Sequence, residues 1–100
     1  RVAPNPPPPD TDAVDIEWVN PRRGPQPLGT LTQPISLTAD TGHIERSYIY
    51  CTRIGEVDTF GPFSQAAKAD SAWRHREIDA SHNPHVTCPD VLTELLVELI

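Results

Sequence analysis

The chain has 100 residues, a formal net charge of -6 and a sequence pI near 5.0. This acidic balance argues against a nucleic-acid or anionic-membrane surface, which needs a basic face. No apolar run approaches the roughly 20 residues of a membrane span. The two cysteines are too few for a disulfide-stapled miniprotein. We expect a cytoplasmic protein that binds neither nucleic acid nor membranes. The sequence contains no methionine, which leads us to expect a piece of a longer chain.

Residues 1–34 form a proline-rich segment, with nine of the twelve prolines of the chain. Four consecutive prolines at 6–9 favour extended polyproline II and cannot donate backbone hydrogen bonds. We interpret this segment as a linker, with a ligand for a proline-binding module as the alternative. Within it, residues 13–19 alternate apolar and acidic side chains, which predicts a short strand or an extended segment.

Residues 35–100 carry the pattern of a βαβ unit followed by a final helix, which places the chain in the α/β class. A β-prone run at 35–39 precedes a strand at 47–52, whose composition indicates burial on both faces. Apolar spacing predicts a helix over 61–69, with Pro62 in its first turn and Thr59 or Asp58 as the cap. A second, less buried strand follows at 73–79, then a loop, then an apolar helical stripe from 91 to 100. The two strands of such a unit are parallel.

Chemically useful side chains follow both predicted strands. His82 lies in the loop after the second strand, and Glu56 and Asp58 lie in the loop after the first. The carboxyl ends of parallel strands meet at one edge of a sheet, where open α/β folds place their sites. A carboxylate and an imidazole there supply the acid–base half of a hydrolase triad. Ordinary polar contacts between loop residues are the alternative.

A metal site must be weighed against this pair. His82, His85 and Cys88 are potential zinc ligands at three-residue spacing. The chain has no CxxC or HExxH motif, and Pro84 and Pro89 stiffen the segment. We therefore expect no metal and no cofactor.

Several stretches of the chain, in order and at similar spacing, resemble the C-terminal part of the α/β-hydrolase family. The match is to the bacterial branch related to plant hydroxynitrile lyases and methyl-ester esterases. The stretches that carry it are Arg46–Thr52, Phe60 and Phe63, Ala69–Trp73, Glu77–His82 and Val86–Leu92. Gln26–Leu28 and Thr32–Pro34 resemble the exit from that family's cap, so the resemblance spans residues 18–100 and implies that residues 1–34 are a linker or cap remnant.

The resemblance implies roles for single residues. His82 is the expected catalytic histidine, preceded by Ser81 where the family usually has glycine. The acid is expected in the loop after the preceding strand, as Asp58, with Glu56 as the alternative. The nucleophile belongs in a Gly-x-Ser-x-Gly elbow, and none of the serines here is flanked in that way.

The resemblance therefore implies a portion of a serine-type hydrolase of small carboxylic esters, inactive alone because its nucleophile lies outside this chain. One alternative is a hydroxynitrile lyase that uses the same histidine as a base. Another is a non-catalytic binding module that keeps the fold and has lost the nucleophile. We also expect the open sheet edge to invite association.

Overall fold

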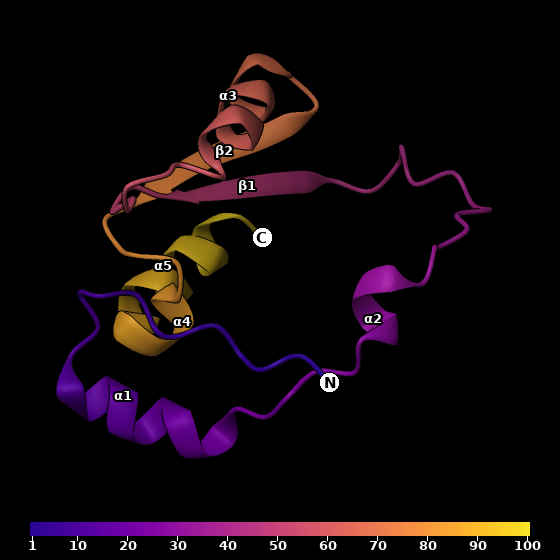
Figure 1. The fold of residues 1–100 in the computed structure, drawn as a ribbon. Helices are drawn as coiled ribbons and strands as arrows, with labels where there is room; N and C mark the ends of the chain where they lie inside the picture. The colour runs from indigo at the N-terminus through magenta and orange to yellow at the C-terminus, as the bar shows by residue number, and fades with distance from the viewer.

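The computed structural model describes residues 1–100 and contains one small parallel sheet, with the first two α-helices of the chain lying away from it (Figure 1). In chain order the elements are α1 (Ala13–Val19), the 3-10 helix η1 (Asn20–Arg22), α2 (Gly29–Thr32), β1 (Arg46–Cys51), α3 (Gly61–Ala69), β2 (Trp73–Ile78), α4 (Pro84–Thr87) and α5 (Pro89–Glu98). The chain is thus a mixed α/β structure. No helix is long and apolar enough to cross a membrane.

The predicted βαβ unit is confirmed. Strands β1 and β2 pair in parallel, from Arg46 opposite Trp73 to Cys51 opposite Ile78, and α3 connects them and contacts both strands. Parallel pairing requires such a crossover because the second strand must restart at the same end of the sheet as the first. The unit places the loops after β1 and β2 at one end of the sheet.

The expected burial of the two strands is wrong. Strand β1 is half-buried or exposed at every position, whereas β2 ends in Ile78, which is only 3% exposed. The sheet has only two strands, so nothing continues it beyond β1. Only six of the 100 residues are buried, and these lie in α3, in β2 with the turn after it, and at the end of the chain: Ser64, Ala67, Ile78, Ala80, Ser81 and Leu99.

Helix α3 begins and ends close to its predicted limits. Pro62 lies in its first turn, where a missing N–H costs no helical hydrogen bond. The N-cap position is Phe60, so the prediction of Thr59 or Asp58 at that position is wrong. The Asp58 carboxylate nevertheless accepts a hydrogen bond from the Gly61 N–H at 2.8 Å, which satisfies one of the free donors at the helix start.

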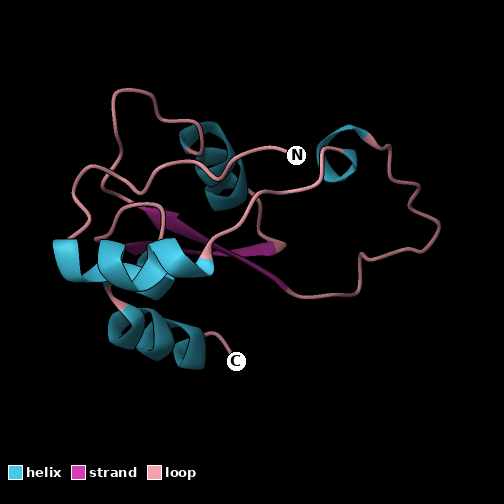
Figure 2. Cartoon of the chain, turned by 60° about the horizontal axis from the view of Figure 1, so that its bottom comes forward, coloured by secondary structure: helices cyan, strands magenta, loops and turns pink.

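The proline-rich segment differs most from expectation. Residues 13–19 form helix α1, not a strand, because no neighbouring strand is there to pair with them and a helix satisfies its own backbone groups. The Ile16 N–H bonds the Asp12 carbonyl at 3.0 Å. The expected β-prone run at 35–39 forms no strand and lies in an exposed loop that spans residues 33–45 (Figures 1 and 2).

The C-terminal helix is confirmed. Helix α5 begins at Pro89, and the preceding residues, expected as loop, contain the one-turn helix α4. Leu92 and Leu95 are half-buried and Leu99 is buried, whereas Val91, Leu96 and Val97 are exposed. Only one side of the apolar helix is therefore covered.

Candidate functional site

A cleft of about 430 Å³ lies at the carboxyl ends of the strands. Its walls come from β1, the loop after β1, and the segment after β2 that leads through α4 into α5. Eight of the fifteen lining residues are hydrophobic, which suits the apolar body of a small organic ligand. The polar or titratable lining residues are Tyr48, Tyr50, Cys51, Arg53, Asp58, Thr59, His82 and His85.

His82 lines this cleft, as its place after the second strand led us to expect. Its imidazole stacks on the Phe60 ring, with the centroids 4.8 Å apart and the planes 10° from parallel. The side chain is exposed and makes no hydrogen bond to another protein group. The stack fixes the plane of the ring and leaves its nitrogen atoms open to a proton-transfer partner.

Asp58 lines the same cleft, but it is not hydrogen-bonded to His82. Its Oδ2 accepts a hydrogen bond from the Tyr50 hydroxyl at 2.6 Å, and its Oδ1 accepts the Gly61 N–H at 2.8 Å. The bond to Asp58 raises the pKa of Tyr50 to about 12, because the carboxylate holds the phenol proton and disfavours a second negative charge beside it. Two donors from different elements therefore hold this carboxylate in place.

Glu56, the alternative acid, lies apart from these residues. It is exposed, does not line the cleft and makes no ion pair. Glu56 is thus a solvent-facing carboxylate, whereas Asp58, two positions later in the chain, lines the cleft. The structure brings Asp58, rather than Glu56, to the cleft that His82 lines.

The cleft holds no serine. Cys51 is the thiol in its wall, and burial, together with the nearby Cys88, raises the pKa of Cys51 and so disfavours the nucleophilic thiolate. Both cysteines are free thiols. No group of three or more His, Cys, Asp or Glu side chains is arranged to hold a metal ion.

Three contacts in the structure were missed by reasoning from the sequence. They are the Tyr50 bond to Asp58, the Phe60 stack on His82, and a hydrogen bond between Ser64 and His75 at 2.7 Å on the helix side of the sheet. Tyr50 sits one residue before the end of β1, which is a signal that it lies near the strand's carboxyl edge. Its partner across the loop could be known only from the folded chain.

Comparison of the chain with family models, with curated proteins and with solved structures finds no match.

Proposed function

We propose that this chain forms the histidine and acid side of an active site that hydrolyses small carboxylic esters, in a domain of α/β-hydrolase type. The observation that carries the proposal is the shared cleft. His82 and Asp58 come from the loops after two adjacent parallel strands and line one cavity. This is the edge of a parallel sheet at which open α/β folds bind their ligands.

In this function His82 is the general base. It takes the proton of a serine hydroxyl as the oxygen attacks the ester carbonyl, and returns it to the departing alcohol. The imidazole carries a positive charge between these steps, so a carboxylate in the same cleft stabilises it. Water then hydrolyses the acyl-enzyme by the same proton path.

Asp58 is suited to that role although it already accepts two hydrogen bonds. An ionised carboxylate offers about four acceptor positions, and the bonds from Tyr50 and Gly61 use one on each oxygen. Asp58 can therefore accept a further bond from an imidazole N–H without losing the contacts that hold it.

The serine must come from outside these 100 residues, because no serine lines the cleft. We therefore expect the 100-residue chain alone to show no turnover of a nitrophenyl ester above that of buffer. Turnover by the chain alone that is abolished by replacing one of its own residues would contradict this part of the proposal.

A second candidate function is ligand binding without turnover. It is favoured by the absence of a hydrogen bond between His82 and Asp58, whose carboxylate is bonded to Tyr50 and Gly61 instead.

A hydroxynitrile lyase would use the same histidine as its base, with cleavage of a cyanohydrin as the activity.

The test compares the two histidines of the cleft in the intact protein. We expect His82→Gln to lower the turnover of a nitrophenyl ester by about 10³-fold or more, as loss of a triad member does. His85→Gln is the matched control, since His85 lines the same cleft, and we expect it to change turnover by less than about threefold, within ordinary surface effects. Circular dichroism checks the fold of both variants.

Near-normal turnover in His82→Gln would reject the proposed base. Saturable ligand binding by the intact protein with no turnover of ester would identify the binding module. Cleavage of a cyanohydrin that depends on His82, without ester hydrolysis, would identify the lyase.

A further inference from the structure

The start of the chain carries a run of prolines that the proposed function does not use. Residues 3–8, here called the polyproline segment, lie in no helix or strand. Proline fixes its own φ angle and biases the residue before it toward extended backbone. Every residue of the segment except Pro4 precedes a proline. The segment therefore favours the polyproline II helix, which has about three residues per turn.

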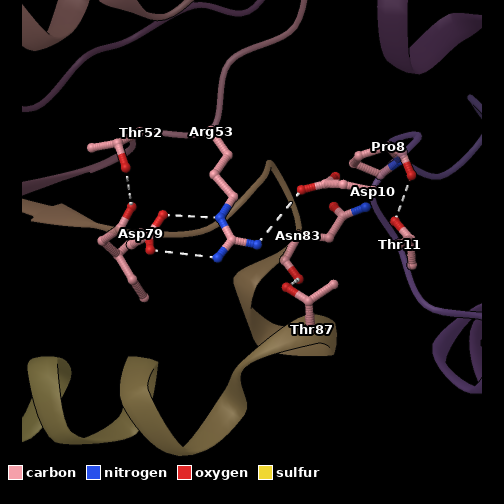
Figure 3. A network of polar contacts seen from close by, with 9 residues as sticks. Pro8, Asp10, Thr11, Thr52, Arg53, Asp79, Asn83 and Thr87 are labelled. Carbon is pink, nitrogen blue, oxygen red and sulfur yellow. Dashed lines mark hydrogen bonds and ion pairs between the residues drawn. The ribbon is translucent and has the colours of Figure 1, made fainter.

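Backbone contacts hold the polyproline segment at both of its ends. Before it, Val2 and Gln26 exchange two backbone hydrogen bonds of 2.7 and 2.8 Å. At its other end, the Pro8 carbonyl accepts the Thr11 N–H at 3.0 Å and the Thr11 hydroxyl at 2.6 Å (Figure 3). The segment is thus held in place before a partner binds, which lowers the entropy that binding would cost.

A network through Arg53 ties the same end of the segment to the sheet. Arg53 donates from Nε to Asp79 Oδ1 at 2.9 Å and from Nη2 to Asp79 Oδ2 at 3.4 Å, and its Nη1 lies 3.9 Å from Asp10 Oδ2 (Figure 3). Asp79 follows β2 directly, and Asp10 follows the prolines directly. The last residues of the proline run are therefore connected to the folded βαβ unit.

Two of the three edges of a polyproline II helix are free in this segment. With about three residues per turn, residues 3 and 6 share one edge, residues 4 and 7 a second, and residues 5 and 8 the third. Ala3, Pro4 and Pro6 are exposed and Pro7 is half-buried. None of these four residues makes a hydrogen bond to the rest of the chain.

The third edge is the one that the chain itself engages. The Asn5 carbonyl accepts a hydrogen bond from Arg23, and the Pro8 carbonyl accepts those from Thr11. The hydrogen bonds of the segment thus fall on residues 5 and 8 alone. A partner can therefore reach the edges at 3 and 6 and at 4 and 7 without breaking any of them.

Arg1 extends the spacing of the two prolines on the second edge. It lies three residues before Pro4, and Pro4 lies three residues before Pro7, so the sequence reads Arg-x-x-Pro-x-x-Pro. At about 3.1 Å per residue, successive members of this series are about 9 Å apart. Arg1 is exposed and forms no ion pair within the chain. A partner therefore meets a free guanidinium in line with two prolines.

We propose that the polyproline segment is a docking site for an SH3 domain. The aromatic groove of such a domain takes Pro-x-x-Pro segments because the polyproline II helix is already formed. Here it accepts the pairs Ala3–Pro4 and Pro6–Pro7, while an acidic pocket beside the groove pairs with Arg1 and fixes the register. The inference is independent of ester hydrolysis, since no residue of the segment lines the cleft.

The experiment is calorimetric titration of the intact protein with a panel of isolated SH3 domains, each with an acidic pocket beside its groove. We expect saturable one-to-one binding to members of this panel. A WW domain, whose groove lacks the acidic pocket, is the comparison. Absence of saturable binding to the whole panel at up to about 1 mM, the range of weak recognition, would overturn the proposal. Binding to the WW domain alone would reject the SH3 domain as the partner.

Variants of the proline positions test the edges. We expect Pro4→Ala and Pro7→Ala each to weaken binding by about tenfold, as loss of an anchor residue does. Asn5→Ala is the matched control on the third edge and should weaken binding by less than about twofold. Circular dichroism checks the fold of each variant. Equal effects of Pro4→Ala and Asn5→Ala would show that the two free edges are not what the partner reads.

A double-mutant cycle tests the role of Arg1. Arg1→Gln should weaken binding by about tenfold, the scale of a hydrogen bond to a charged group. Lys68→Gln removes the same charge from α3 and should change binding by less than about twofold, as a screened charge does. In an SH3 domain whose acidic pocket has been neutralised, Arg1→Gln should cause no further loss. An undiminished loss there would reject the pairing of Arg1 with the pocket.

Discussion

At the scale of single residues, Asp58 connects three parts of the structure. It follows β1 in the chain. Its carboxylate accepts one hydrogen bond from the hydroxyl of Tyr50 in β1 and another from the N–H of Gly61, the first residue of α3. The carboxylate is thereby held where the strand, its loop and the following helix meet. This placement explains why it lines the cleft, while Glu56, two residues earlier, faces solvent.

The Tyr50 titration reports this contact directly. We expect Asp58→Asn to lower the pKa of Tyr50 from about 12 toward its ordinary value of 10.0, because the amide cannot repel the phenolate. The raised pKa means that the hydrogen bond stabilises the fold fully below pH 10.0 and that this contribution is lost as the pH rises through about 12. Ultraviolet absorbance of tyrosinate measures the change. An unchanged titration in Asp58→Asn would show that the two side chains do not interact, and Glu56→Gln serves as the control.

The two carboxylates also predict different catalytic effects. In the intact protein, we expect Asp58→Asn to lower ester turnover by about 10² to 10⁴-fold, because a neutral amide does not stabilise the imidazolium. Glu56→Gln should change turnover by less than about threefold, within ordinary surface effects. Steady-state rates with one ester measure both. A larger loss at Glu56 would move the acid to that residue and leave the assignment of His82 intact.

At the scale of elements, the link between α3 and the sheet is a polar contact as well as an apolar one. Ser64 on α3 is 2% exposed and lies 2.7 Å, Oγ to Nε2, from His75 on β2. His75 also stacks parallel to the Tyr48 ring on β1 at 6.3 Å. Ala67, one turn further along α3, is buried on the same side. The hydrogen bond, the ring stack and the buried side of α3 together hold the helix and both strands against one another.

Removal of the hydroxyl should loosen this contact. We expect Ser64→Ala to lower the free energy of unfolding of the intact protein by about 1–3 kcal/mol, because the half-buried imidazole loses its partner. Gln65→Ala changes the exposed neighbour on the same helix and should stay within about 0.5 kcal/mol. Urea denaturation measures both. Equal stability of the two variants would show that the hydrogen bond does not hold α3 on the sheet.

At the scale of the whole molecule, the chain exposes more surface than its size requires. Its accessible area is 7990 Å², whereas a compact protein of this mass exposes about 5,700 Å². Its radius of gyration is 16.0 Å, against about 13 Å for a compact domain of 100 residues. The uncovered surface includes large apolar side chains: Phe63 on α3, Val97 on α5 and Ile100 at the end of the chain.

This surface predicts poor stability of the 100-residue chain by itself. The open edges of a two-stranded sheet offer free backbone donors and acceptors to other chains, and the exposed apolar side chains favour association. We expect broad unfolding and a sedimentation coefficient that rises with protein concentration. A sharp, cooperative melt of a monomer, unchanged over a wide concentration range, would contradict this prediction.

The sequence by itself determined the elements whose local pattern and local signals agree. Strands β1 and β2 have compositions that suit a pleated surface, α3 has proline in its first turn, and α5 has an apolar stripe. The order strand, helix, strand implied parallel pairing, and parallel pairing placed the loops that hold Asp58 and His82 at one end of the sheet. The shared position of these residues was thus predictable from topology.

Only the tertiary structure decided what depends on contacts between distant residues. Residues 13–19 fit a period of two, yet they form α1, because a strand needs a partner and none lies beside this segment. The burial of β1 was overestimated because burial depends on what covers a strand, not on its composition. Likewise, the Asp58 bond to Tyr50 and the stack of His82 on Phe60 arise where separate segments meet. No local pattern encodes these distances, since they are set by how the helices and loops close around the sheet.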